Sequence, residues 1–243
     1  MKSWTFLDIA CPRNGNMKGD IFHILNRGVE KREIFYSEKD YLRFVHNLYD
    51  FNDTAYSLPY PQRSKLRDFG HRMSKGRGES KEQIVDLLCW SLMPNHSHNL
   101  LMEKIDGGAS TFSKKIFGGY TKYINEEKDR SGVLFQGRSK IIPVRKDPHF
   151  IHLPFYIMAN PIDLTEPNWK EKGIKNLEKV IQHLENYRWS SFPDLIGKEN
   201  FPFVINKNLF YEIFQTDEKQ FKKDFIEWLK SYTAGHDFGK FID

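Results

Sequence analysis

The segment from Ile84 to Met102 constrains the fold of this chain more than any other part of the sequence. It contains a largely apolar run, Ile84–Met93, then the turn-forming pair Pro94-Asn95, then a second strand-like run that begins at His96. Because only two residues separate the runs, we expect them to pair as an antiparallel hairpin. A mainly antiparallel sheet is therefore the framework on which the other elements have to be placed.

Further strand and helix signals lie on both sides of this hairpin. Extended segments are expected at residues 21–25 and over residues 134–144, where branched and aromatic residues cluster. Helices are expected after Ser37 and after Ser110, because serine is a good helix N-cap and apolar residues follow at helical spacing. This order predicts an α+β fold, with helices flanking a mainly antiparallel central sheet.

Prolines divide the chain around Tyr156. Asp147-Pro148 is typical of a helix start, and Pro154 is expected to break or kink that helix. A short helix that carries Tyr156 and Asn160 should follow and end before Pro161.

Composition predicts three parts. Residues 1–17 form an N-terminal arm, residues 18–165 the main domain, and residues 166–243 a C-terminal extension rich in alternating charges. Within the main domain, residues 52–80 lose periodicity and carry a run of basic side chains, which fits a solvated loop as well as a segment that follows phosphates. Late in the extension, the spacing of Phe221, Phe225 and Trp228 predicts a helix with an apolar packing stripe.

Bulk properties narrow the function classes. The formal net charge is +5 and the pI about 9.0, which suits an anionic partner but also an ordinary solvated surface. Cys11 and Cys89 are the only cysteines, so a disulfide framework and a thiolate-rich zinc site are excluded and a reducing cytoplasm is expected. No apolar run approaches the roughly 20 residues that span a bilayer, so no membrane is expected as a partner.

His96 and His98 are the candidate metal ligands. With one residue between them on a strand, both imidazoles point to the same face, although two core or exposed histidines can have the same spacing. Asn160 can add an amide oxygen. Two neutral nitrogens and one oxygen leave coordination positions free, which suits Mg²⁺ or Mn²⁺.

Tyr156 is the candidate nucleophile. It lies four residues before Asn160, so the two share one helix face. Most helical tyrosines only pack, but a nearby divalent cation favours the phenolate, which attacks phosphorus and gives a covalent intermediate.

Several of these segments occur together in one known family. Over residues 18–196 the chain resembles the REP-associated tyrosine transposases, a group of the single-tyrosine HUH transposases, in five segments: Phe22–Gly28, Met93–His98, Leu134–Arg138, Tyr156–Pro161 and Tyr187–Ser191. The resemblance implies that residues 18–165 form an HUH catalytic domain with a ferredoxin-like or RRM-like core, followed by a helical appendage. Ser97 departs from the family, which normally has a bulky apolar residue between the histidines.

The resemblance also implies a function and a set of roles. The enzymes are metal-dependent, single-strand DNA endonucleases and strand transferases that cut at the foot of short imperfect hairpins through a 5′-phosphotyrosine. By position, His96 and His98 match the metal-binding histidines, Asn160 the third ligand and Tyr156 the nucleophile. Expected partners are single-stranded DNA hairpins like REP palindromes, in the bacterial cytoplasm at the nucleoid, with monomer or homodimer left open.

DNA contacts are expected on two segments that flank the site. The resemblance implies contacts at Asn26, Arg27, Gln136 and Arg138. Lys140 and Arg145 follow closely and either line a phosphate groove or form the exposed face of a strand.

Other functions remain open at this point. One is a catalytically idle protein that keeps the fold to bind hairpin DNA. Another is a metallohydrolase with the histidine pair on a barrel strand, which needs further ligands, and only His149 and His152 are nearby candidates. A nucleotide hydrolase with three alternating histidines is excluded, because Leu100 occupies the third position.

Overall fold

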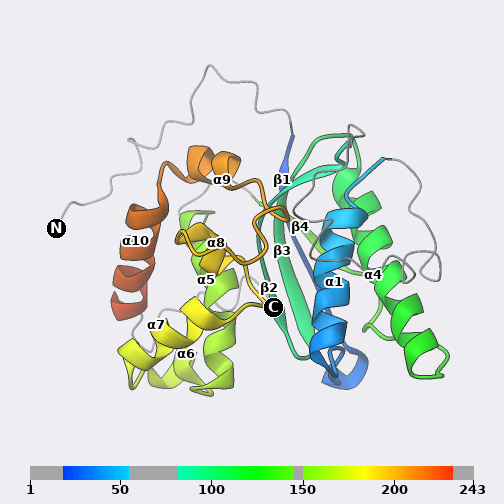
Figure 1. The fold of residues 1–243 in the computed structure, drawn as a ribbon, viewed down its shortest axis with the longest axis horizontal. Helices are drawn as coiled ribbons and strands as arrows, with labels where there is room; N and C mark the ends of the chain where they lie inside the picture. Colours follow the sequence, from blue (N-terminus) through cyan, green and yellow to red (C-terminus); the bar gives the residue numbers. More distant parts are fainter. Residues whose placement is uncertain (1–18, 55–81, 145–149, 232–243) are drawn as a thin grey trace.

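A four-stranded antiparallel sheet in the order β2-β3-β1-β4 forms the middle layer of the protein (Figure 1). The computed structural model describes residues 19–54, 82–144 and 150–231. The strands are β1 (Ile21–Arg27), β2 (Val85–Met93), β3 (His96–Glu103) and β4 (Lys140–Pro143). The predicted α+β class with a mainly antiparallel sheet and flanking helices is confirmed.

Helices cover both faces of the sheet (Figure 1). On one face lie α1 (Glu38–Asp50) and α4 (Gly108–Glu127). The other face carries the later helices: α5 (Leu153–Ala159), α6 (Trp169–Lys172), α7 (Leu177–Asn186), α8 (Phe192–Leu195), α9 (Lys207–Phe214) and α10 (Glu218–Ser231). Short 3₁₀ helices span Val29–Lys31, Phe150–His152 and Asn160–Leu164. Within the described ranges, no helix is long and apolar enough to cross a membrane.

The predicted hairpin is present, and its register decides which side chains share a face. Strands β2 and β3 pair around the Pro94-Asn95 turn, with Met93 opposite His96. Strand β1 pairs with β3 so that Leu25 lies opposite His98. His96 and His98 alternate with Ser97 on β3 and so point to one face of the sheet, which is the face covered by α5, because the Tyr156 ring lies beside His98. Ser97 and Asn99 alternate with them and face α1 and α4.

Helix α4 forms from the predicted apolar stripe. Its residues Phe112, Ile116, Tyr120 and Ile124 are all fully buried against the sheet and α1. The two helices approach closely because Gly119 has no side chain: a Cβ there would lie 2.3 Å from the Phe51 ring. Burial of each large apolar side chain stabilises the fold by about 1.5–3 kcal/mol.

Two predicted helix boundaries are wrong, for local reasons. Helix α4 begins two residues before Ser110, after Gly107 in the left-handed conformation, and the Glu103 carboxylate of β3 accepts the Ala109 N–H at 2.8 Å. Pro154 does not break a helix but lies in the first turn of α5, where its missing N–H costs nothing. The expected helix start at Asp147-Pro148 lies outside the described residues.

The chain also continues past Asn160 in helical form instead of stopping. Pro161 is the second residue of the 3₁₀ helix Asn160–Leu164, where a proline is again tolerated near the start. The α10 stripe is confirmed, with Phe221, Phe225 and Trp228 all buried. The later helices share one hydrophobic core with the sheet, and the proposed boundary after residue 165 stays a prediction.

The segment Trp189–Ser191 protects the edge of the sheet at β2. Its backbone forms an antiparallel bridge between Ser190 and Ser91, and the Trp189 carbonyl accepts the Leu92 N–H at 2.8 Å. The Ser191 hydroxyl accepts the Trp90 N–H at 3.0 Å. The segment Trp189–Ser191 therefore has a structural role, because it satisfies backbone groups that an open edge strand would leave unpaired.

We predict that Ser191→Ala lowers the free energy of unfolding by about 1–3 kcal/mol, because the Trp90 N–H is then left buried without an acceptor. Urea denaturation of the variant and of Ser131→Ala, a matched change at an exposed serine, measures this. Equal stabilities of the two variants would contradict the edge role.

Candidate metal and nucleophile site

Both histidines of the predicted pair project from β3 onto one face of the sheet. Their ring centroids are 5.0 Å apart at an angle of 83°, and both side chains are buried. The His96 Nδ1 lies 2.5 Å from the Asn95 side-chain oxygen. Because an amide oxygen only accepts, His96 donates through Nδ1 and keeps the lone pair on Nε2.

His23 is a third imidazole at the site, which the sequence interpretation missed. It projects from β1, stacks on His98 with centroids 5.1 Å apart, and brings its Nε2 to 3.0 Å from the His98 Nδ1. One proton is shared in this contact. When His98 donates it, the His98 Nε2 is free to bind a cation, and His23 fixes the ring orientation. The histidine was visible in the sequence, but the β1–β3 register that brings it here was not.

All three imidazoles are held in the neutral form. Burial lowers the pKa of His23 to about 3. Burial, with the nearby charges of Arg27 and Lys170, lowers the pKa of His96 to about 3. The pKa of His98 lies well below its usual value, mainly through burial and then through the neighbouring histidines. Neutral rings keep the lone pairs that metal binding needs.

Helix α5 carries Tyr156, and the 3₁₀ helix that directly follows it places Asn160 beside the same histidines. The Tyr156 ring lies 6.3 Å from the His98 ring, nearly perpendicular to it. The Asn160 amide nitrogen donates to the Tyr156 carbonyl at 2.9 Å and to the Ile157 carbonyl at 3.3 Å. The Asn160 side chain also lies beside His96. Since its nitrogen is used within the helix, the amide oxygen is the atom that faces the histidines.

Lys170 of α6 is a second residue that the sequence interpretation missed. Its ammonium donates to the Tyr156 hydroxyl at 3.1 Å and lies 4.4 Å from the centre of the ring. A cation in this position stabilises a phenolate more than a phenol. No motif surrounds Lys170, and only the packing of α6 beside α5 reveals it.

The predicted DNA-binding residues divide between two faces. Arg27 lies opposite His96 and Lys140 opposite Leu25, so both project from the histidine face. Gln136 is exposed.

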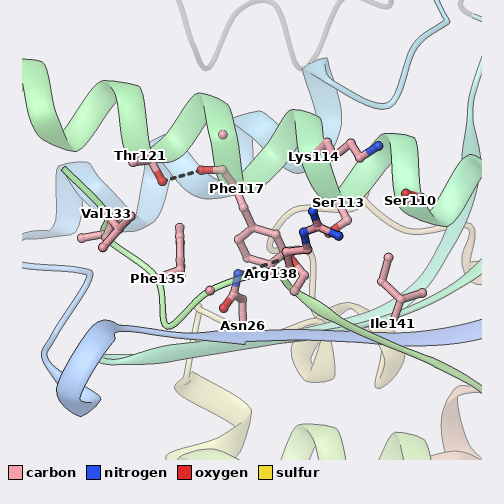
Figure 2. Close-up of a pocket in the computed structure, with 14 residues that line it drawn as sticks. Asn26, Ser110, Ser113, Lys114, Phe117, Thr121, Val133, Phe135, Arg138 and Ile141 are labelled. Atoms are coloured by element: carbon pink, nitrogen blue, oxygen red, sulfur yellow. Dashed lines mark hydrogen bonds between the residues drawn. The ribbon is translucent and has the colours of Figure 1, made fainter.

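Asn26 and Arg138 are not brought to the histidines. They line a pocket next to α4 on the opposite face (Figure 2). Arg145 lies outside the described residues.

The donor atoms present fit a divalent cation with open coordination. Two imidazole Nε2 atoms and the Asn160 oxygen form a neutral set, in which the first metal shell still has room for water or phosphate. Over the ranges 19–54, 82–144 and 150–231, no group of three or more His, Cys, Asp or Glu side chains could hold a metal. The metallohydrolase alternative therefore lacks its additional ligands in that part of the chain, His152 included.

Comparison with known proteins finds one weakly similar solved structure and no match to a family model or a curated protein. No protein-family model matches the chain, and no curated protein matches it. Among solved structures, that of the REP-associated tyrosine transposase bound to a REP hairpin is similar, with a TM-score of 0.44 and 14% sequence identity. The match covers 79% of this chain and 88% of that chain. Because this likeness is weak, function is inferred from the site and its chemistry.

We predict that stability falls as the pH drops from about 6.5 toward 5. In this range the three histidines protonate in the unfolded chain but stay neutral in the folded protein, so each takes up a proton on unfolding. Each therefore lowers the free energy of unfolding by up to about 1.4 kcal/mol for every unit by which the pH falls. Urea denaturation in EDTA at several pH values measures the slope. In His23→Leu, the slope of the free energy of unfolding against pH should be smaller by about the contribution of one histidine. An unchanged slope would contradict the buried neutral cluster.

Proposed function

We propose that this chain is a metal-dependent, single-strand DNA endonuclease and strand transferase that acts at the foot of short hairpins through a 5′-phosphotyrosine. The observation that carries the proposal is the meeting of Tyr156 with the histidine pair on one face of the sheet. Lys170 donates to the phenol oxygen, and its positive charge stabilises the phenolate form in which tyrosine is a nucleophile.

The cation would be held by His96, His98 and Asn160. The Nε2 atoms of both histidines and the Asn160 oxygen are the free donors, and Mg²⁺ or Mn²⁺ suits such a set. When bound, the cation supplies Lewis-acid polarisation of the phosphate to be cut. His23 supports the site from behind by fixing the orientation of His98.

The protein's own groups account for the covalent step. Tyr156 loses its proton to water, and Lys170 stabilises the resulting oxyanion through its hydrogen bond. The phenolate oxygen bonds to phosphorus while the bond from phosphorus to the 3′ oxygen breaks, and that oxygen leaves as a 3′ hydroxyl after taking a proton from water. Attack by a 3′ hydroxyl of another strand reverses the step and rejoins DNA, so no external energy source is required.

Charge on the same face suits a nucleic-acid substrate. Arg27 and Lys140 project from neighbouring strands beside the histidines, and Lys140 is exposed. Such cations position a phosphate backbone without reading sequence. The hairpin as substrate is what the family resemblance of the five sequence segments implies; Arg27 lies in one of these segments and Lys140 does not.

We predict that Tyr156→Phe abolishes formation of a covalent protein–DNA adduct and leaves hairpin affinity unchanged, because the ring remains and only the attacking oxygen is lost. The assay incubates the full chain with hairpin oligonucleotides and Mn²⁺, labels the DNA 3′ of the cut, and separates adducts on a denaturing gel. An adduct that survives in Tyr156→Phe would rule out this nucleophile.

Lys170→Met serves as a graded control in the same assay. It keeps the apolar contact with the ring but removes the charged hydrogen bond, so adduct formation should slow by about 10- to 100-fold without disappearing. If the unchanged protein binds hairpins but never forms an adduct, the alternative of a catalytically idle hairpin-binding protein replaces the proposal.

A further inference from the structure

A pocket of about 680 Å³ lies on the face of the sheet away from the histidines (Figure 2). It is bounded by α4, by the segment before β4, and by the ends of β1 and β4. Asn26 at its floor lies opposite Ser97 in the β1–β3 pair, whereas the histidines occupy the alternate positions. The pocket is therefore separate from the metal and nucleophile site.

The walls of the pocket combine aromatic rings with unbalanced positive charge. Phe117 and Phe135 meet edge to face, with centroids 5.0 Å apart, and form the apolar wall. Lys114 and Arg138 lie at the rim, both exposed, and neither forms an ion pair with a described residue. In Figure 2, Arg138 reaches from the segment before β4 toward α4. Uncompensated cations beside an aromatic wall favour an anionic, aromatic ligand.

Polar groups inside the pocket are left available. Ser113 is only 3% exposed, lines the pocket, and forms no hydrogen bond with any residue that the structure describes. Asn26 is also buried and donates one amide hydrogen to Ser139 at 3.2 Å, which leaves its second hydrogen unused. A buried hydroxyl and an amide N–H can bond the edge of a nucleobase.

Gly118 of α4 lines the pocket, and close packing does not account for a glycine there. Glycine in the interior of a helix is destabilising relative to alanine. Its neighbour Gly119 is explained by the close Phe51 ring, but a Cβ at Gly118 would meet nothing within 4 Å. Packing therefore does not require glycine at position 118, and because this residue lines the pocket, a large side chain there would be added at the pocket wall.

We propose that this pocket binds one unpaired nucleotide of the DNA whose hairpin foot occupies the histidine face. The base packs against Phe117 and Phe135 and bonds to Asn26 and Ser113, and the flanking phosphates lie near Lys114 and Arg138. The proposal rests on the proposed single-strand DNA function. The volume is ample for a nucleotide, within the usual range of ligand sites.

The edge strand β4 gives the DNA a path between the two faces. Ile141 lies opposite Ile24 and lines the pocket, while Lys140 lies opposite Leu25 on the histidine face. Arg138 and Lys140 therefore place cations on the two sides of one edge. A single strand that crosses β4 reaches both sites without passing through the sheet.

The test uses the full chain in a Tyr156→Phe background, so that the DNA stays intact. The probe is a hairpin oligonucleotide with single-stranded flanks, in which 2-aminopurine replaces one flank base at a time, and the reference is the same hairpin without flanks. Binding to the flanked hairpin should be tighter, and one flank position should change its fluorescence. Gly118→Leu should lower affinity for the flanked hairpin at least about fivefold and abolish that signal, with no effect on the reference hairpin.

Two controls isolate the pocket. Gly118→Leu should melt at the same or a higher temperature, because leucine favours the helix. Thr111→Leu adds the same side chain at an exposed α4 position outside the pocket and should change nothing. Lys114→Ala should weaken flanked binding more than Lys122→Ala on the same helix.

The outcomes separate this proposal from the function it rests on. If Gly118→Leu binds the flanked hairpin with unchanged affinity and fluorescence, the pocket proposal is wrong and the proposed enzyme stands. A variant that also loses the unflanked hairpin contradicts a flank-specific pocket. If the protein with Gly118 intact binds no hairpin at all, both proposals fail together.

Discussion

The register of β1 against β3 is the constraint on which the site depends. It sets Leu25 opposite His98 and Arg27 opposite His96, and it brings His23 onto the same face. A shift of one residue would turn the β1 side chains to the other face of the sheet and remove both the imidazole partner and the arginine. The site is thus a property of the whole sheet, and helix α5 only completes it by laying Tyr156 over His98.

Sequence patterns predicted those parts of the fold that depend on contacts between residues close together in the chain. The turn at Pro94-Asn95 fixed the hairpin, and the apolar stripe fixed α4, because both depend on neighbours in sequence. Contacts between distant segments could not be predicted in this way. His23 and Lys170 reach the site through strand register and helix packing, which leave no local signature.

The wrong boundaries have the same origin. Ser110 is a good cap by propensity, but the Glu103 carboxylate from a neighbouring strand accepts an N–H at the start of α4 instead. Pro154 is a helix breaker only in a helix interior, and at the first turn of α5 it is compatible with the helix. In both cases tertiary context decided between outcomes that sequence alone allows.

The two faces of the sheet differ in how well their polar groups are satisfied. His98 pairs with His23, His96 with Asn95, and the Asn160 amide nitrogen with helix carbonyls, so these side chains are hydrogen-bonded. Ser97 and Asn99, on the opposite face, are buried with polar atoms that find no partner in the described structure, a cost of about 1–3 kcal/mol for each unsatisfied group. Ser97 is also one of the positions at which the chain departs from the family it resembles. The hairpin therefore has hydrogen-bonded histidines on one face and buried polar atoms without partners on the other.

The central claim is that the phenol and the imidazoles surround a common cation, and diffraction from crystals grown with Mn²⁺ tests it most directly. The account predicts an anomalous peak bonded to the Nε2 atoms of His96 and His98 and to the Asn160 oxygen, with the Tyr156 ring beside it. A well-ordered crystal that shows no such peak at millimolar Mn²⁺, or shows the ion bound elsewhere, would contradict it.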